Sequence, residues 1–255
     1  MDHGVPENAP WRPDVRDRIV IVTGAAQGIG SAVARAFVCE GAKVIAADLE
    51  ERRFTFENQT PGRIRSCIAD VSRAADVEAM VDLCLKEYGI PEVLINIAAI
   101  STPCPFKKMD LEGWQQVIDV NLTSVFLCTR AVVPHMVGKG RGSIINFSSI
   151  IAHTGGETSS HYTAAKAGVE GLSRTLALEL GPHGIRVNVI APGMIDTRML
   201  ALMPDEQRRK VIGKVPLRRI GRPEELVGPC LLLASDAGSY ITGQTIHVNG
   251  GLFPT

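Results

Sequence analysis

The feature that most constrains the fold is a repeated alternation of short apolar runs with longer amphipathic stretches. The apolar runs are continuous at their centres, which is typical of parallel strands covered on both faces. We expect strands at residues 18–23, 43–47, 64–69, 92–98, 143–148, 185–190 and 245–248. Helical patterns fill the gaps near residues 28–40, 73–88, 110–138, 161–181 and 222–234. This order predicts right-handed βαβ units, and therefore an α/β fold with one doubly wound, seven-stranded parallel sheet and helices on both faces.

The length of 255 residues suits one large α/β domain. We expect a short, proline-bearing tail at residues 1–17 and a single domain at residues 18–255. One connection is unusually long, because about thirty residues separate the strand that ends at Ile190 from the helix that begins near Pro223. Connections of that length in compact domains act as lids or binding loops. Since this one leaves the carboxyl end of a strand, where open α/β sheets bind ligands, we expect residues 194–220 to cover the substrate.

Composition argues against several classes of protein. The 27 lysines and arginines equal the 27 aspartates and glutamates, so charge gives no indication of binding to nucleic acid or an anionic membrane. No continuous apolar run approaches the roughly 18–20 residues that cross a bilayer, and the N-terminus has no hydrophobic signal region. The six cysteines form no C-x-x-C pair and no cluster with histidine, which predicts reduced, mostly buried thiols and no metal. We therefore expect a cytoplasmic protein.

A glycine-rich turn follows the first expected strand, in TGAAQGIG at residues 23–30. Gly24 permits a tight turn, Gly28 lets backbone amides approach a pyrophosphate, and Gly30 allows close packing of helix on strand. The helix that begins there offers unpaired N–H groups and a favourable dipole to phosphate oxygens. Asp48 follows the second strand at the distance expected for a carboxylate that binds ribose. These features together predict a dinucleotide site.

Asp48 also predicts which dinucleotide binds. A carboxylate there accepts hydrogen bonds from both ribose hydroxyls but would repel a 2′-phosphate. Position 49 is leucine and residues 25–27 are Ala-Ala-Gln, so neither place offers a cation to pair with that phosphate. Arg52 and Arg53 lie nearby but are more typical of a solvated helix face. NAD is favoured over NADP.

Tyr162 and Lys166 lie four positions apart in SSHYTAAKAG, residues 159–168. On a helix this spacing places both side chains on one face, although such a pair alone is typical of an ordinary surface. Free tyrosine, with a pKa near ~10, is a poor base at neutral pH. We expect Lys166 and the positively charged nicotinamide to favour the phenolate. Tyr162 could then remove the hydroxyl proton of an alcohol as hydride leaves the adjacent carbon.

The glycine spacing T-G-x-x-x-G-x-G, together with Tyr162-x-x-x-Lys166, resembles the short-chain dehydrogenase/reductase family. The resemblance runs from Arg18 to Gly251. Further motifs support it in order and spacing: DV at 70–71, NIAA at 96–99, NLTS at 121–124, FSS at 147–149 and PGMIDT at 192–197. There is one departure, because the family's N-N-A-G is here N-I-A-A. The resemblance implies a Rossmann-type fold and a homotetramer, or a dimer, built on the helices near 110–138 and 161–181 and on the C-terminal strand.

The resemblance also implies roles for individual residues. Ser149 would polarise the substrate oxygen, Tyr162 would move the proton, Lys166 would tune Tyr162 and bind ribose, and Asn121 would hold a relay water. The implied cofactor contacts are Gly24, Gln27, Gly28, Ile29, Gly30, Asp48, Asp70, Val71, Asn96, Ala98, Tyr162, Lys166, Pro192, Gly193, Ile195 and Thr197. The expected substrate contacts are Ser149, Ile151, His153, Tyr162 and Met199. Met194, Leu200 and Met203 would add to the apolar inner face of the cover.

We expect an NAD-dependent oxidoreductase that interconverts a ketone and a secondary alcohol, such as a polyol, a sugar or a hydroxysteroid. Enoyl reductases of the wider family separate the tyrosine and lysine by six residues, so the spacing here favours chemistry at a carbinol. One alternative is a 3-oxoacyl-thioester reductase of fatty-acid synthesis, which would use NADPH and carry a cation near the glycine turn, where this chain has Gln27. Another is a nucleotide-binding scaffold without turnover, which the presence of Ser149, Tyr162 and Lys166 disfavours.

Overall fold

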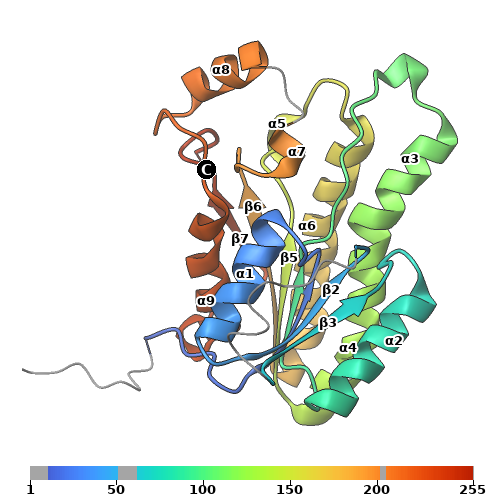
Figure 1. Ribbon diagram of the computed structural model, residues 1–255, viewed down its shortest axis with the longest axis vertical. Coiled ribbons are helices and arrows are strands. Elements are labelled where there is room, and N and C mark those ends of the chain that lie inside the picture. The colour runs from blue at the N-terminus through green and yellow to red at the C-terminus, as the bar shows by residue number, and fades with distance from the viewer. Residues whose placement is uncertain (1–10, 51–61, 202–204, 255) are drawn as a thin grey trace, which may run out of the picture.

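The computed structural model describes residues 11–50, 62–201 and 205–254. Its strands form one parallel sheet of seven strands in the order β3-β2-β1-β4-β5-β6-β7 (Figure 1). The strands are β1 (Ile19–Thr23), β2 (Lys43–Asp48), β3 (Ile64–Ile68), β4 (Val93–Asn96), β5 (Gly142–Phe147), β6 (Ile185–Pro192) and β7 (Thr245–Val248). The predicted α/β fold with a doubly wound parallel sheet is confirmed. Strand order reverses beside β1, where β4 pairs with it. The connections that follow these two adjacent strands therefore lead to opposite faces of the sheet at this switch point.

Helices cover both faces of the sheet (Figure 1). Apart from α8 (Asp205–Lys214), the longer ones are α1 (Gly28–Cys39), α2 (Ala74–Glu87), α3 (Leu111–Ile118), α4 (Ser124–Lys139), α6 (Ser160–Leu180) and α9 (Val227–Ala234). One core cluster joins α1 and α9 to the sheet, and a second joins α2, α4 and α6 to the opposite face. Along β1, Val20 and Val22 enter the first cluster whereas Ile19 and Ile21 enter the second. This alternation explains why a central strand is apolar at every position.

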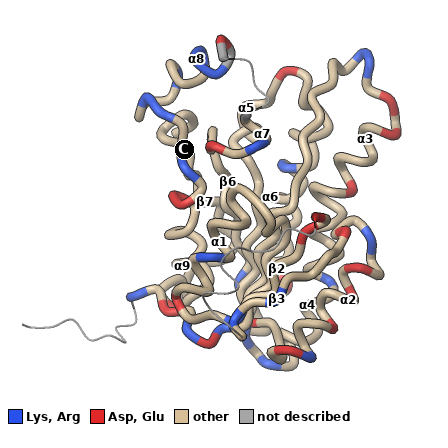
Figure 2. Tube along the Cα trace, viewed as in Figure 1, with Lys and Arg blue, Asp and Glu red and all other residues tan. Residues whose placement is uncertain are grey.

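Charged residues are kept out of the centre of the sheet. Figure 2 shows lysine, arginine, aspartate and glutamate interspersed over helices and turns, whereas the central strands are almost entirely uncharged. Strands β1, β4 and β5 contain no charged residue. The desolvation that a lone buried charge would require is thereby avoided.

The helix predicted at residues 110–138 is not one regular helix. A π-helical turn, Asp119–Thr123, joins α3 to α4. Such turns insert a residue into the helical ladder and occur often at functional sites. Asn121 lies inside this turn and is fully buried. Periodicity alone did not predict this interruption, because one inserted residue leaves the apolar pattern on either side nearly unchanged.

The combined helix Leu111–Lys139 is long and apolar enough, by length and composition only, to cross a membrane, with a hydropathy of 1.4. This segment is not the continuous apolar run considered in the sequence, because Asp119, Asn121 and Arg130 lie within it. In the fold, α4 packs against β4, β5 and α2. Its apolar residues thus have protein partners, as in the core helix of a sheet-containing domain.

The predicted N-terminal tail does not extend unchanged to residue 17. Val15 is buried in the core, and the amide of Asp17 donates to the carbonyl of Gly41 at 3.0 Å. The domain therefore begins before the first strand, at least at Val15.

The expected cover at residues 194–220 contains two helices, α7 (Arg198–Ala201) and α8 (Asp205–Lys214). Figure 1 shows α8 standing apart from the sheet, above α5 (Ile151–Thr154) and α7. The two ends of the segment meet, because the Asp196 amide donates to Gly221 at 2.8 Å and the Gly221 amide donates to Met194 at 2.9 Å. The segment is thus a long loop whose two ends are joined by backbone hydrogen bonds. Arg52, Arg53 and Met203, considered above, lie outside the described residues.

All six cysteines are free, but only half are buried. Cys84, Cys128 and Cys230 are buried, Cys67 and Cys104 are intermediate, and Cys39 is exposed. Burial raises the pKa of the Cys84 thiol to about 12, which makes this thiol unreactive. The expectation of mostly buried thiols holds for three of the six.

Replacement of Phe37 tests the core beneath α1. The Phe37 side chain is fully buried, so Phe37→Ala should lower the free energy of unfolding by about 3–5 kcal/mol. The matched control is Phe106→Ala, since Phe106 is 77% exposed and its removal should change that free energy by less than about 0.5 kcal/mol. Urea unfolding followed by circular dichroism measures both. Equal effects of the two substitutions would contradict this assignment of the core.

Candidate active site

The glycine turn between β1 and α1 is closed by contacts that exclude side chains. Gly24 has a φ of +67°, and a Cβ there would lie 2.8 Å from the Ala98 Cα beyond β4. A Cβ on Gly30 would overlap the carbonyl of Gly24. Gly28, at φ +55°, would carry its Cβ 3.2 Å from the methyl group of Thr197. The turn therefore exposes backbone around a space for a ligand, and a residue with a Cβ at these positions would clash with its neighbours.

Asp48, the last residue of β2, abuts this turn. Its Oδ2 accepts a hydrogen bond from the Ala26 amide at 2.9 Å, and its Oδ1 accepts one from the Glu50 amide at 3.3 Å. Gln27 precedes α1 as its N-cap without a side-chain capping bond. Ile29 packs onto the core of the α1 face. Glycine turn, uncapped helix N-terminus and adjacent carboxylate together fit the pyrophosphate and ribose of a dinucleotide.

The exit of β4 is tied to β1. The hydroxyl of Thr23 accepts hydrogen bonds from the amides of Ile97 and Ala98, at 3.1 and 3.3 Å. The change from N-N-A-G to N-I-A-A therefore leaves the backbone here with its partners. Ala98, which the change leaves in place, lies against Gly24.

The side chain of Asn96 has a structural role. Its Nδ2 donates to Asn146 at 2.8 Å, and Asn146 in turn donates to Ser173 at 2.9 Å. Asn96 is only 5% exposed, so its side chain serves to join β4, β5 and α6. A cofactor contact of Asn96 would therefore have to use its backbone, and it stays a prediction.

The remaining predicted cofactor residues lie at the same edge of the sheet. Asp70, after β3, accepts hydrogen bonds from the amide and hydroxyl of Ser72, and Val71 is buried in the α2 face. After β6, Pro192 accepts a hydrogen bond from the Ile150 amide at 2.9 Å. Gly193 is pressed against Asn249, and Ile195 is buried at 7% exposure. Together with Thr197 beside Gly28, these residues surround the carboxyl ends of the central strands.

Lys166 is buried on α6, close to the tyrosine. Its Nζ donates to the carbonyl of Phe147 at 2.8 Å and lies 5.7 Å from the centre of the Tyr162 ring. Burial lowers the pKa of Lys166 to about 8. One of its three donors is thus used by β5, which leaves two for other partners.

Tyr162 lies on α6 within hydrogen-bond reach of Ser149. Burial raises the pKa of Tyr162 to about 12, and a hydrogen bond with Ser149 only partly opposes this rise. The expectation that Lys166 and a positively charged nicotinamide together favour the phenolate concerns the enzyme with bound cofactor, and it stays a prediction. Ser149 and Tyr162 are brought together as predicted. At neutral pH the phenol keeps its proton and is able to donate it.

Asn121 in the π-helical turn has an unusual set of partners. Its Nδ2 donates to the carbonyls of Ile100 and Val117, at 3.0 and 2.9 Å. Its Oδ1 is buried and has no hydrogen-bond partner among the residues that the structure describes. A buried carbonyl oxygen of this kind is the normal acceptor for an ordered water. This geometry agrees with the implied relay role.

Three residues were expected to contact only the substrate: Ile151, His153 and Met199. Ile151 begins α5 and covers Gly156, and Met199 on α7 is 42% exposed. His153 is used within the protein, because its Nε2 lies 2.9 Å from Glu170 Oε1 and its ring stacks on Phe253 at 5.1 Å. A contact of His153 with substrate stays a prediction, and its Nε2 is already used by Glu170. A histidine in a loop beside the pocket gave no signal of these distant partners.

His161, directly before Tyr162 on α6, is 1% exposed. Its Nδ1 accepts from the Tyr162 amide at 2.8 Å, so Nε2 carries the proton and donates to Thr102 at 3.1 Å. His161 therefore ties the start of α6 to the loop after β4. Its position directly before Tyr162 was the one available signal.

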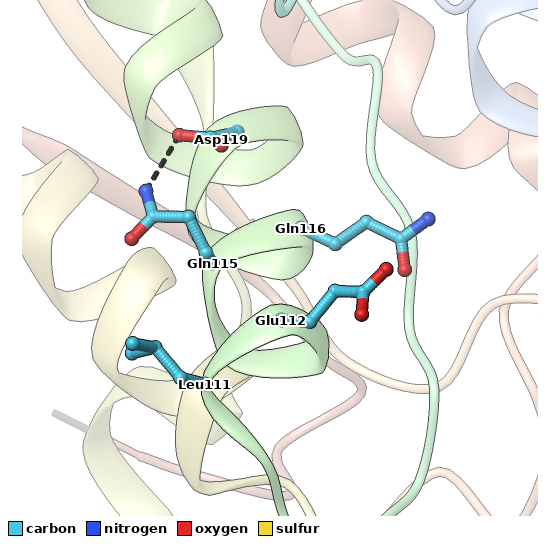
Figure 3. Close-up of a pocket in the computed structure, with 5 residues that line it drawn as sticks. All are labelled: Leu111, Glu112, Gln115, Gln116 and Asp119. Carbon is cyan, nitrogen blue, oxygen red and sulfur yellow. Dashed lines mark hydrogen bonds between the residues drawn. The ribbon is translucent and has the colours of Figure 1, made fainter.

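A surface hollow of about 650 Å³ lies elsewhere, along α3. Figure 3 shows its five lining side chains, with Gln115 donating to Asp119 at 2.8 Å. None of the predicted site residues lines it, and all five come from one helix and the turn after it. Within the described ranges, no group of three histidine, cysteine, aspartate or glutamate side chains is placed to hold a metal ion. The candidate site is therefore the edge where Gly24, Asp48, Ser149 and Tyr162 gather.

Comparison with known proteins agrees with this site. The family model described as enoyl-(acyl carrier protein) reductase matches residues 24–253. The 3-oxoacyl-[acyl-carrier-protein] reductase FabG of Thermotoga maritima is 39% identical over 92% of this chain and 97% of that protein, and that of Escherichia coli is 37% identical over the same shares. The cis-4-hydroxycyclohexanecarboxylate dehydrogenase of Sinomonas cyclohexanicum is 38% identical over 92% of this chain and 96% of that protein.

Among solved structures, the crystal structure of gox2181 superposes with a TM-score of 0.89 at 31% identity, covering 95% of this chain and 98% of that one. The family model, the relatives and the seven-stranded parallel sheet all lead to one assignment. The chain belongs to the short-chain dehydrogenase/reductase family of oxidoreductases, which act on ketones and secondary alcohols with a nicotinamide cofactor.

Proposed function

We propose that the chain reduces a ketone to a secondary alcohol, and that the ketone is a 3-oxoacyl thioester. The direction rests on the relatives, because the matched proteins of Thermotoga maritima and Escherichia coli are named reductases. The Tyr162 phenol supports this proposal, since it is hydrogen-bonded to Ser149 and could give its proton to the oxygen of a ketone as that oxygen is reduced.

The bound nicotinamide cofactor would supply the hydride. Ser149, already hydrogen-bonded to Tyr162, would donate to the ketone oxygen and polarise it. Tyr162 would give its proton to the alkoxide as it forms. Lys166, held by Phe147 O, would stabilise the resulting phenolate and bind ribose through its remaining donors. A water on the buried Oδ1 of Asn121 would return a proton from solvent.

The substrate class rests on the relatives. Proteins from Thermotoga maritima and Escherichia coli, matched over nearly their whole lengths, are named 3-oxoacyl-[acyl-carrier-protein] reductases. This favours the thioester over the polyols, sugars and hydroxysteroids expected first. A ring hydroxy acid is the second candidate, since the relative from Sinomonas cyclohexanicum is 38% identical and is named for such a substrate.

We propose NADH rather than NADPH as the reductant. Asp48 Oδ2 is anchored to the Ala26 amide, so the carboxylate stays where a 2′-phosphate would meet it. Gln27 supplies no compensating charge. The thioester-reductase resemblance alone favours NADPH, and the physical argument from Asp48 opposes it.

We also propose a cytoplasmic homotetramer, as the family resemblance implies. Several large apolar side chains are exposed on the helices expected at its interfaces: Leu111 on α3, Phe126 and Val137 on α4, and Leu178 on α6. Leu178 is 80% exposed, and a second copy of the chain would cover such residues.

Tyr162→Phe tests the chemistry. The variant keeps the ring but loses the proton, so turnover of 3-oxoacyl thioesters should fall by about 10²–10⁴-fold. The dissociation constant for NADH, measured by fluorescence, should change little. Tyr240→Phe is the matched control, because Tyr240 is fully exposed and should keep wild-type turnover. Near-normal activity of Tyr162→Phe would refute the mechanism.

Asp48→Ala tests the cofactor assignment. Loss of hydrogen bonds from a charged group should weaken NADH binding by about 10–100-fold and relax discrimination against NADPH. Asp82→Ala, at an exposed site on α2, is the control. Kinetics with both cofactors give the ratio of kcat/KM values. An unchanged ratio would remove Asp48 from the ribose site, and a wild-type preference for NADPH would refute the cofactor proposal.

The pH dependence follows from the two buried groups. The pKa of Lys166 is lowered to about 8 and that of Tyr162 is raised to about 12, so both carry their protons below about pH 8. The kcat/KM for ketone reduction, which reports the free enzyme, should be level below about pH 8 and fall above it as Lys166 loses charge. Alcohol oxidation should instead rise with pH. A reduction rate that increases between about pH 8 and 10 would contradict this assignment.

A further inference from the structure

A buried carboxylate lies behind the catalytic residues and has no place in the mechanism above. Glu170 follows Lys166 by one turn of α6 and is 4% exposed. A carboxylate buried to this degree requires hydrogen-bonded partners, because desolvation disfavours its charge. The identity of those partners indicates what Glu170 does.

One oxygen of Glu170 contacts residues on both sides of Ser149 in the chain, Ser148 before it and His153 after it. Its Oε1 lies 2.8 Å from the Ser148 hydroxyl and 2.9 Å from His153 Nε2. Ser148 directly precedes Ser149, and His153 lies on α5, which begins two residues after Ser149. Since an ionised carboxylate only accepts hydrogen bonds, the hydroxyl and the Nε2–H of His153 are the donors.

The same network reaches Lys166. The Ser148 hydroxyl also lies 3.1 Å from the backbone carbonyl of Lys166, while Lys166 Nζ donates to the carbonyl of Phe147. The segment Phe147–Ser148 is thus bonded to α6 by two donors, Lys166 Nζ and the Ser148 hydroxyl, and the single proton of that hydroxyl faces both the Lys166 carbonyl and the nearer Glu170 Oε1. Glu170 provides the contact that also extends to α5.

His153 connects this network to the end of the chain. Its ring stacks on Phe253 at 5.1 Å and meets His247 of β7 edge-on at 4.8 Å. Arg174, 4.0 Å from Glu170 Oε2, is the cation facing the carboxylate from its own helix. His153 is therefore held on one side by Glu170 and on the other by aromatic rings.

We propose that Glu170 and His153 are positioning residues for the reaction, which hold the turn at residues 148–153 so that the Ser149 hydroxyl stays in line with Tyr162. The inference rests on the proposed function. Helix α5 has four residues, too few to be stable by itself, so its placement depends on contacts such as this one. A shift of a catalytic group by about 1 Å lowers turnover by as much as ~10²-fold.

Three variants and one control test this role. Glu170→Leu removes both acceptor bonds, and kcat should fall by about 10–100-fold while the KM for cofactor changes less than about twofold. Glu170→Gln keeps an oxygen that accepts both bonds and should restore most of the lost kcat. His153→Phe keeps the stacking on Phe253 but not the bond to Glu170, and should lower kcat by about 3–10-fold. Glu179→Leu, on the exposed face of the same helix, should have no effect.

A second measurement does not depend on activity. Hydrogen–deuterium exchange of residues 148–154 should be faster in Glu170→Leu and His153→Phe than in wild type, with unchanged affinity for NADH. If Glu170→Leu does not fold, His153→Phe decides the question, since this side chain is 27% exposed and its loss leaves the core intact.

Wild-type kcat and wild-type exchange in His153→Phe would overturn the inference, as would failure of Glu170→Gln to recover activity above Glu170→Leu. A loss of affinity for NADH equal to the loss of kcat would also overturn it. These results are distinct from failure of the proposed function, in which the wild-type chain itself would reduce no 3-oxoacyl thioester and no other ketone.

Discussion

The site depends on the close approach of two strand ends at the switch point of the sheet. Gly24, leaving β1, lies so near Ala98, leaving β4, that a single Cβ would meet backbone at 2.8 Å. Thr23 holds the same loop by accepting hydrogen bonds from Ile97 and Ala98. This contact closes the glycine turn at the N-terminus of α1, where we propose that the pyrophosphate binds. It also places the exit of β4 beside Asn121, whose amide bonds to Ile100.

Burial then determines the electrostatics of the catalytic pair. Tyr162 and Lys166 share one face of α6, and both are disfavoured in their charged forms by the protein around them. The phenol keeps its proton to high pH, and the ammonium loses its charge more readily than a solvated lysine does. A reducing enzyme needs the first property. When the reaction runs toward the ketone, the phenol must instead lose its proton. The positive charge of a bound oxidised nicotinamide would then lower the pKa of the phenol and oppose the effect of burial.

A second layer of polar contacts supports this pair. Glu170 joins Ser148 to His153, and His161 joins the start of α6 to Thr102. Asn96 and Asn146 likewise join β4 to β5 through a side-chain hydrogen bond near the candidate active site. Glu170, His161 and Asn96 each bond to a residue of a different segment, so the loops around Ser149 and Tyr162 are held by several elements at once.

The sequence by itself determined the fold class, the strand and helix order, and the positions of Gly24, Asp48, Asn121, Ser149, Tyr162 and Lys166. These follow from periodicity and from motifs that are local in the chain. Tertiary structure alone decided the π-helical turn around Asn121, the inward use of Asn96 and His153, and the raised pKa of Tyr162. Each of these depends on which residues from distant segments surround a side chain, and neither periodicity nor spacing along the chain contains that information.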